Sequence, residues 1–347
     1  MRKILITGGA GFVGRHFVKR FLDAGDLVVV VDSIVPRTGG IGPVRHMGVV
    51  GGSLVYDFTD AVLVELGGWP LFEPFDYKNF RFFRKDCRAY FHECADTDFD
   101  YVLHLAAIVG GRLMISYNPI AVAEDLSLDA EFWQWAVRTK PRKIVCFSSS
   151  AAYPICFQEP DTYRLLKEEM IGFENWVGVP DLSYGWAKLT HERLAHLAYE
   201  THGLKSVIYR PFSGYGEDQD LTYPFPSICK RALENKGSPV LKVWGSGKQM
   251  RDFIHIEDCV DGVLATMDKI DDAGALNLST GVYTSMEAFA SMAANLCGYQ
   301  PEIQGTPDKP TGSFARAGDT TKQRQYGFES STAFLDGVQR GLSYLSK

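Results

Sequence analysis

The chain has 347 residues, of which 46% are hydrophobic and 22% charged, and its formal net charge is −6. This length suits one large α/β domain with a smaller companion, and the composition is that of an ordinary globular protein. The acidic balance argues against a nucleic-acid partner, which usually requires a basic surface, and no apolar stretch approaches the roughly 18 residues of a membrane span.

The seven cysteines are an odd number, and no two of them form a C-x-x-C pair. This usage indicates reduced thiols rather than a disulfide framework or a zinc site, so we expect a cytoplasmic protein without a bound metal. The N-terminus leads directly into a strand pattern, without the basic segment and apolar run of a signal peptide.

The first predicted elements are a strand over Lys3–Thr7, a helix from about Phe12 to Ala24 and a second strand over Leu27–Asp32. A glycine-rich turn joins the first strand to the helix. Strand, helix and strand within about 30 residues form the βαβ unit of a parallel sheet.

Three later apolar runs predict further strands of the same sheet, at Tyr101–Leu105, Lys143–Phe147 and Ser206–Arg210. Helical patterns over Ala121–Thr139 and Tyr184–His202 precede the last two of these strands. Strands that alternate with helices predict an α/β fold with a doubly wound parallel sheet.

The turn after the first strand carries the pattern G-x-x-G-x-x-G, with glycines at Gly8, Gly11 and Gly14. Glycines at this spacing allow a tight turn, bring the backbone close to a pyrophosphate and let the helix lie on the sheet, while the helix N-terminus attracts the phosphate charge. Asp32 closes the second strand, where a carboxylate can accept both ribose hydroxyls of the adenosine and repel the extra phosphate of NADP. The pattern therefore predicts a Rossmann domain that binds NAD.

Several further segments, in a fixed order, resemble those of the extended short-chain dehydrogenase family, also called the NAD-dependent epimerase/dehydratase family. The resemblance covers nearly the whole chain, and it implies an enzyme that acts on a nucleotide-activated sugar. The segments are Asp86-Cys87-Arg88, His104-Leu105-Ala106-Ala107, Ser148-Ser149-Ser150, the Y-x-x-x-K motif from Tyr184 to Lys188, Arg210-Pro211-Phe212 with Tyr215-Gly216, and Arg251 to Asp258.

Within the family, Ala106–Gly111 and Val243–Gly247 are most similar to GDP-mannose 3,5-epimerases and GDP-fucose synthases, so a GDP-sugar is the favoured substrate. The cofactor contacts that the resemblance implies are Gly8, Gly11, Phe12, Val13, Gly14, Asp32, Asp86, Cys87, Leu105, Ala106, Ala107, Tyr184 and Lys188. The implied substrate contacts are Val109, Gly110, Gly111, Ser149, Ser150, Ser213, Arg251 and Arg316. Ser213 stands where the family usually has asparagine.

Tyr184 and Lys188 are four residues apart and therefore share one face of a helix. A phenol has an ordinary pKa of about 10, and a neighbouring ammonium and a nicotinamide cation would both lower such a value. Tyr184 could then take the proton of a sugar hydroxyl, with the hydroxyl of Ser149 on the same oxygen. An ordinary surface Tyr/Lys pair is the alternative, which the upstream cofactor motif disfavours. Ser150 is the second candidate for the catalytic serine, and Ser148 is expected to end the strand structurally.

In similar enzymes, the residue two positions after the catalytic serine decides which reaction follows the first oxidation of the sugar. Dehydratases carry a glutamate there and 3,5-epimerases a cysteine, whereas this chain carries Ala151. The second acid/base of those epimerases, a His or Lys near Pro226, is replaced by the segment Tyr223-Pro224-Phe225. Without these acid/base residues, the remaining reaction is hydride transfer at C4 of the sugar. It predicts a 4-epimerase, with a 4-dehydrogenase or a 4-keto reductase as alternatives. A 3,5-epimerase and a non-catalytic NAD-binding regulator are less favoured.

Other conspicuous residues have simpler interpretations. Arg251 and Arg316 are candidates for the sugar diphosphate because a guanidinium matches two phosphate oxygens, although either could be a solvated surface arginine. His104 and His255 lie in apolar runs and are expected to be core histidines rather than ligands. The tryptophans of the helix before the third sheet strand, Trp133 and Trp135, suggest packing or a dimer face, and in this family that helix commonly joins a homodimer interface.

The predicted domain organisation follows the sheet. Residues 1–212 and 252–273 form the NAD-binding domain, and residues 213–251 and 274–347 form a smaller α/β lobe for the nucleotide sugar. Residues 37–80 fit no period and are predicted to be an insertion that is partly ordered over the site.

Overall fold

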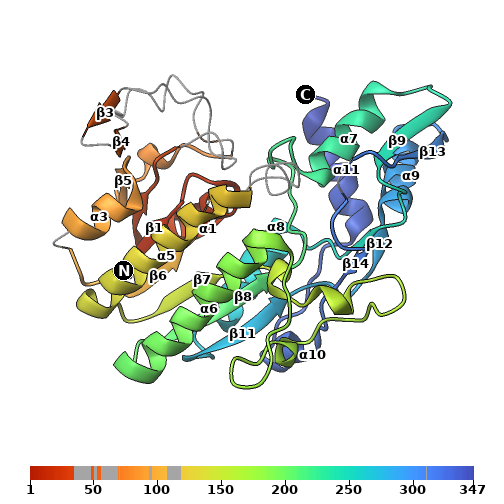
Figure 1. The fold of residues 1–347 in the computed structure, drawn as a ribbon. Helices are drawn as coiled ribbons and strands as arrows, with labels where there is room; N and C mark the ends of the chain where they lie inside the picture. Colours follow the sequence, from red (N-terminus) through yellow and green to blue (C-terminus); the bar gives the residue numbers. More distant parts are fainter. Residues whose placement is uncertain are drawn as a thin grey trace.

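Seven parallel strands form the central sheet of the computed structural model, which describes residues 1–34, 48–50, 53–55, 69, 71–93, 96–107, 119–309 and 311–347. Their order across the sheet is β11-β8-β7-β6-β1-β2-β5 (Figure 1). The strands are β1 (Lys3–Thr7), β2 (Leu27–Val31), β5 (Phe80–Phe83), β6 (Tyr101–His104), β7 (Ile144–Phe147), β8 (Ser206–Pro211) and β11 (Asp272–Leu278). This arrangement confirms the predicted doubly wound sheet.

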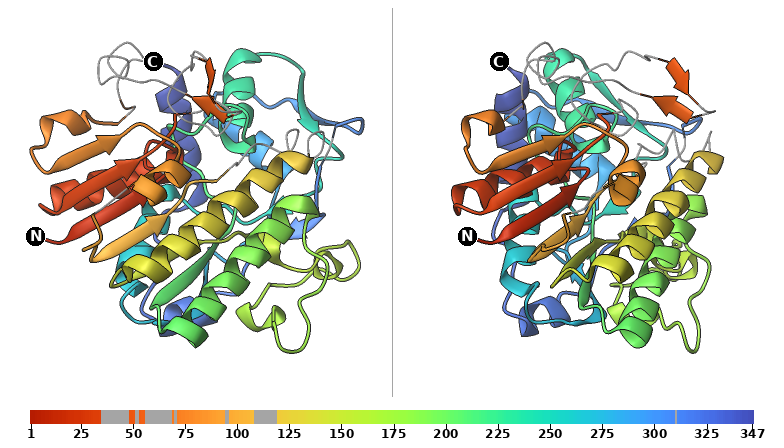
Figure 2. Two further views of the ribbon diagram at one scale, coloured as in Figure 1. Left: turned by 60° about the vertical axis from the view of Figure 1, so that its left-hand side comes forward. Right: turned by 90° about the vertical axis from the view of Figure 1, so that its left-hand side faces the viewer.

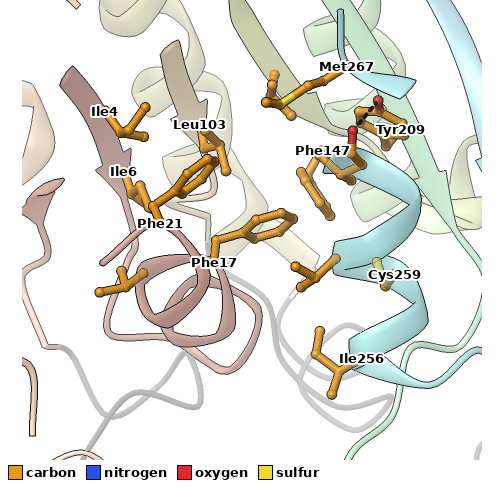
Figure 3. Close-up of a cluster of buried hydrophobic side chains, with 14 of the residues drawn as sticks. Ile4, Ile6, Phe17, Phe21, Leu103, Phe147, Tyr209, Ile256, Cys259 and Met267 are labelled. Atoms are coloured by element: carbon orange, nitrogen blue, oxygen red, sulfur yellow. Dashed lines mark hydrogen bonds between the residues drawn. The ribbon is translucent and has the colours of Figure 1, made fainter. Parts of the chain in front are cut away.

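One face of the sheet is covered by α1 (Phe12–Asp23) and α8 (Ile256–Thr266). Alternate strand residues point to this face, because side chains of a strand alternate with a period of two. Figure 3 shows Phe17 and Phe21 of α1 meeting strand residues such as Ile4 and Leu103 in one apolar cluster.

The opposite face packs against α3 (Cys87–Glu93), α5 (Ala123–Thr139) and α6 (Leu182–His202). The helices α5 and α6 lie side by side in both views of Figure 2. Trp135 of α5 is fully buried in this cluster and Trp133 nearly so, which fits the core-packing interpretation of both tryptophans. No helix in the described part of the chain is long and apolar enough to cross a membrane.

A smaller lobe has its own core, to which Phe225, Phe289 and Val338 contribute. Figure 1 shows its main elements gathered at the upper right. They are α7 (Pro224–Glu234), β9 (Val240–Trp244), α9 (Met286–Leu296), β13 (Glu302–Thr306) and α11 (Phe334–Leu345), with the short strands β10 (Met250–Arg251), β12 (Thr284–Ser285) and β14 (Ala315–Arg316).

All five predicted strands are present, each within one residue of its predicted ends. The two edge strands, β5 and β11, were not predicted. β5 follows a stretch without a clear period, and β11 begins with the turn-like residues Asp272, Ala273 and Gly274. Because β11 pairs with β8, the large sheet continues past residue 273, where the predicted boundary placed the start of the lobe.

Most of the predicted insertion, residues 37–80, lies outside the described residues. Its described parts include the hairpin of β3 (Gly48–Val50) and β4 (Ser53–Val55). Near its end, the ring of Trp69 packs edge-on against Phe80 of β5 and is buried in the same core as α1. The remaining short elements are η2 (Pro74–Asp76), η3 (Pro119–Val122), η4 (Ser150–Ala152), η5 (Ile155–Phe157), η6 (Glu168–Met170) and α10 (Thr321–Gln325).

Candidate active site

A cavity of about 1190 Å³ lies at the carboxyl ends of the central strands and reaches the smaller lobe. The chain order reverses between β1 and β6, since β2 and β5 lie on one side of β1 and the later strands on the other. Open α/β sheets bind ligands at this kind of switch point. The predicted site residues that line the cavity are Gly8, Gly11, Phe12, Val13, Gly14, Asp32, Asp86, Cys87, Leu105, Ala106, Ala107, Ser149, Ser150, Tyr184, Lys188, Ser213 and Arg251.

Two glycines explain why the turn after β1 can lie so close to its neighbours. Gly8 has φ +70°, and a Cβ there would stand 2.7 Å from the backbone nitrogen of Ala106. A Cβ on Gly14 would stand 2.3 Å from the carbonyl oxygen of Gly8. Side chains at either position would force the turn away from β6 and α1 away from the turn. The result is a cradle in which the N-terminus of α1 faces the cavity, which fits a pyrophosphate.

Asp32, the residue predicted to meet the adenosine ribose, lines the cavity directly after β2. Its carboxylate accepts hydrogen bonds from the backbone nitrogens of Ala10 at 2.9 Å and Ile34 at 2.7 Å, and burial raises its pKa. Arg84, which sequence reasoning missed, also lines the cavity. Burial lowers the pKa of Arg84 to about 10, against the attraction of Asp32. Arg84 follows a strand that was itself not predicted, so no sequence signal placed it here.

We expect the protein to bind NAD at least about tenfold more tightly than NADP, because the carboxylate of Asp32 repels a phosphate on the adenosine ribose. Isothermal titration of both dinucleotides measures this preference. The positive charge of Arg84 offsets part of the repulsion, so Arg84→Ala should widen the preference and Asp32→Ser should narrow it. Equal affinities of the unaltered protein for the two cofactors would contradict the prediction.

Tyr184 and Lys188 lie on the first turns of α6 and both line the cavity. The Nζ atom of Lys188 is 5.6 Å from the centre of the Tyr184 ring. Burial acts to lower the pKa of Lys188, but Tyr184 and the carboxylates of Asp125 and Asp129 outweigh it, so the net shift of this pKa is upward. Lys188 is therefore held as a buried ammonium beside the phenol.

The start of α6 rests directly on the loop that carries Ser149, the predicted catalytic serine. A Cβ on Gly185 would stand 2.5 Å from the carbonyl oxygen of Ala151, so this residue has room for no side chain. The Oγ of Ser149 accepts a hydrogen bond from the backbone nitrogen of Ala151 at 3.1 Å. Its hydroxyl proton remains available for a ligand in the cavity.

Ser148 has the structural role that was predicted for it. Its hydroxyl donates to Glu192, which holds the buried guanidinium of Arg210 by two hydrogen bonds, at 2.9 and 2.6 Å. Ser148 thus joins β7 to α6 and β8, although it also reaches the cavity wall, whereas Ser149 and Ser150 face the ligand space.

The lobe side of the cavity contains Ser213, Tyr223 and Arg251. Ser213 has φ 32°, a left-handed conformation that asparagine adopts more readily than serine. The guanidinium of Arg251 donates to the carbonyl oxygens of Met250 at 2.7 Å and Thr311 at 3.1 Å, which hold it at the cavity wall. Burial raises the pKa of Tyr223, and Tyr184, which lines the same cavity, adds to this rise.

Arg316 does not line the cavity. It is buried, and its guanidinium donates to Gln158 at 2.6 Å and to Asp181 at 2.8 Å. Asp181 is the N-cap residue of α6, and its carbonyl oxygen accepts from the backbone nitrogen of Gly185. Arg316 therefore supports the start of α6 through Asp181. The other predicted substrate contacts, Val109, Gly110 and Gly111, lie outside the described residues.

The two histidines interpreted as core residues are buried. His104 accepts or donates a hydrogen bond with Thr7 at 2.8 Å and stacks on Phe132 with ring centres 4.0 Å apart. His255 caps α8 by accepting a hydrogen bond from the backbone nitrogen of Glu257. Neither histidine lines the cavity.

Comparison with known proteins identifies the class of the protein. The pattern of the NAD dependent epimerase/dehydratase family matches residues 4–279, so the chain belongs to this family. Membership confirms the resemblance found in the sequence and the prediction of an enzyme. The name of the family also gives the predicted cofactor, NAD.

Individual relatives cover most of the chain. A Bacillus subtilis (strain 168) protein described as an uncharacterized UDP-glucose epimerase is 27% identical over 354 residues, 99% of this chain and 98% of the relative. A probable GDP-L-fucose synthase of Oryza sativa subsp. japonica is 25% identical over 248 residues, 69% of this chain and 73% of the relative. The structure of dTDP-glucose 4,6-dehydratase from Streptomyces venezuelae, with NAD bound, has the same fold, with a TM-score of 0.78 at 19% identity over 99% of this chain and 97% of that chain.

Proposed function

We propose that the protein is a nucleotide-sugar 4-epimerase that works by reversible hydride transfer at C4 of the sugar. One observation carries the proposal: Ser149, Tyr184 and Lys188 line one cavity with the glycine cradle, while the position that distinguishes other reactions of the family is the apolar Ala151. The set is sufficient for oxidation and reduction of an alcohol. It supplies no ionisable group at Ala151 for removal of a carbon-bound proton.

Each residue has a defined task in this proposal. Gly8, Gly14 and Asp32 would hold NAD, and the bound cofactor supplies the hydride acceptor and later the donor. Tyr184 takes the proton of the C4 hydroxyl and returns it after the sugar has presented its other face. Lys188 keeps the phenolate stable through its buried positive charge. The hydroxyl of Ser149 donates to the reacting oxygen.

The substrate is held at its diphosphate, for which Arg251 is the candidate at the cavity wall. The resemblance of short loops favours a GDP-sugar, whereas the relative that covers nearly the whole chain is described as a UDP-glucose epimerase. We therefore propose a nucleoside diphosphate sugar as substrate class, with GDP- and UDP-sugars tested side by side.

We also propose that the protein acts in the cytoplasm as a homodimer. The helices α5 and α6 pack side by side, and both expose large apolar side chains. These are Leu126 on α5 and Leu182, Trp186, Leu197 and Tyr199 on α6. Because Trp133 and Trp135 are buried within the core, they are not the residues that would form such an interface.

The test is incubation of the protein with UDP-, GDP- and dTDP-sugars in deuterium oxide, followed by mass spectrometry and proton NMR of the recovered sugars. We expect a C4 epimer without deuterium on any sugar carbon, because hydride returns to the carbon that lost it. A 4-keto product that leaves the enzyme, with net reduction of NAD, would establish the 4-dehydrogenase instead.

Deuterium at C3 or C5, or a 4-keto-6-deoxy product, would contradict the proposal. Glu159 and Asp161, the acids of the loop after Tyr153, are exposed and do not line the cavity. Asp220 does line it and lies close enough to Tyr223 to raise the pKa of that phenol. Asp220 is then the first residue to replace in search of a second acid/base.

A further inference from the structure

Beneath Lys188 lies a buried cluster of ionisable groups to which the proposed reaction assigns no task. His191 follows Lys188 by one helical turn on α6, and its Nδ1 atom is 2.9 Å from Oδ1 of Asp129 on α5. The Nε2 atom of His104, at the end of β6, is 3.3 Å from the same oxygen. All three side chains are at least 94% buried. These two imidazole nitrogens form no hydrogen bond with the carboxylate, so the contacts are electrostatic.

The two histidines of this cluster carry different charges. Burial lowers the pKa of His191, but Asp129 reverses this effect and raises the pKa to about 10, with a contribution from Cys146. Burial prevails at His104 and lowers its pKa to about 4, although Asp129 opposes the shift. Burial would raise the pKa of Asp129, yet His191, His104 and Lys188 lower it overall. At neutral pH, Asp129 and His191 are therefore an ion pair and His104 is neutral.

The cluster also touches the cofactor cradle. The Nδ1 atom of His104 is 2.8 Å from Oγ1 of Thr7, the last residue of β1. The same oxygen accepts a hydrogen bond from the backbone nitrogen of Ala106 at 3.3 Å. Thr7 precedes the glycine turn and Ala106 lies against Gly8, so polar contacts run without interruption from the catalytic helix to the cradle.

A buried ion pair seldom stabilises a fold more than an apolar pair of similar size would. Packing alone therefore does not explain why Asp129 and His191 stand inside the core next to Lys188. The charged groups that act on Lys188 are Asp125 and Asp129 of α5 and Tyr184 of its own helix, with the thiol of Cys146 on β7. The positive charge of His191 compensates the negative charge of one of the two carboxylates. It therefore sets the net charge beneath Tyr184 and Lys188.

We propose that Asp129 and His191 are positioning residues, whose ion pair sets the charge beneath Lys188 and links the catalytic helix to the cofactor cradle through His104 and Thr7. The part of this inference that concerns catalysis rests on the proposed function. The part that concerns the ion pair does not require any substrate.

The ion pair is tested first, in the unaltered protein with ¹⁵N-labelled histidine. One imidazole, recognised by its contact with the ring of Trp133 at 5.7 Å between ring centres, should remain an imidazolium at pH 8.5. A second, that of His104, should remain neutral at pH 5.5. Asp129→Asn should release the proton of His191 at pH 8.5. A His191 that titrates near the ordinary histidine pKa of about 6.5 in the unaltered protein would overturn the inference.

The effect on catalysis is tested with His191→Gln, which keeps an N–H donor but removes the positive charge. Less positive charge makes the phenolate of Tyr184 harder to form, so the acid limb of the pH profile of kcat/KM should move up by roughly one pH unit. The matched control is Glu131→Gln, also on α5, where the carboxylate pairs with exposed His92. The control should keep the profile of the unaltered enzyme.

The outcomes separate this inference from the proposed function. An unaltered protein that turns over no nucleotide sugar contradicts the proposed function, while the NMR measurement still decides whether the ion pair exists. If the unaltered protein is active and His191→Gln lowers kcat equally at every pH, the role of His191 is only structural and the inference is wrong.

Discussion

Replacement of Tyr184 by phenylalanine is expected to lower kcat by at least about 100-fold, the usual range for removal of a general acid/base. The change deletes one hydroxyl that faces the cavity and leaves the ring, so the fold and the affinity for NAD should be preserved. Steady-state rates on the substrate found in the panel, together with titration of NAD, measure both effects.

Tyr344→Phe is the matched control, because Tyr344 lies on α11 in the smaller lobe and is 37% exposed at the surface. It should leave kcat unchanged. A Tyr184→Phe enzyme that keeps a tenth of its rate would show that another group takes the proton. Tyr223, another phenol of the cavity, would then be the residue to replace.

Loss of Glu192 is expected to destabilise the fold by about 3–5 kcal/mol, because it leaves the guanidinium of Arg210 charged and unpaired in the core. Arg210 is 2% exposed and Glu192 is fully buried. Glu192 also accepts a hydrogen bond from the hydroxyl of Ser148. Its loss therefore leaves Ser148, at the end of β7 next to Ser149, without this partner. Urea unfolding of Glu192→Ala, followed by circular dichroism, measures the change in the free energy of unfolding.

Two variants control this prediction. Glu200→Ala removes an exposed partner of Arg193 on the same helix and should cost less than about 1 kcal/mol. The double variant Glu192→Met with Arg210→Met should be more stable than Glu192→Ala, because no buried charge is left alone. A single Glu192 variant as stable as the Glu200 control would mean that water reaches Arg210 and replaces the lost carboxylate.

Close packing at the site explains which motif residues could be recognised from the sequence alone. Gly14 is required by contacts with Gly8 and Gly9 in the same turn, and the φ of +70° at Gly8 is a local constraint, so their spacing alone is informative. Tyr184 and Lys188 share a helical face whatever surrounds the helix. Such features depend on local geometry, and the predicted strands accordingly agree with β1, β2, β6, β7 and β8 to within one residue.

Other residues acquired their roles from partners far away in the chain. Arg316 was a candidate for the diphosphate, but it pairs with Asp181, 135 residues earlier, and does not line the cavity. Arg84 lies at the ribose end of the cavity only because β5 pairs with β2 at the edge of the sheet. The sequence does not distinguish an arginine that binds phosphate from one that forms a buried ion pair. Only the residues that surround the guanidinium in the folded protein distinguish these two roles.

The amino-acid sequence by itself determined the doubly wound fold, the glycine turn with Asp32 and the pairing of Tyr184 with Lys188. These follow from periodicity and spacing over short stretches of chain, where the physical constraints are local. Tertiary structure alone decided which arginines face the ligand, the left-handed backbone of Ser213 and the ion pair of Asp129 with His191. Those features depend on contacts between elements distant in sequence, such as the carboxylate of Asp129, which raises the pKa of His191 against the opposing effect of burial.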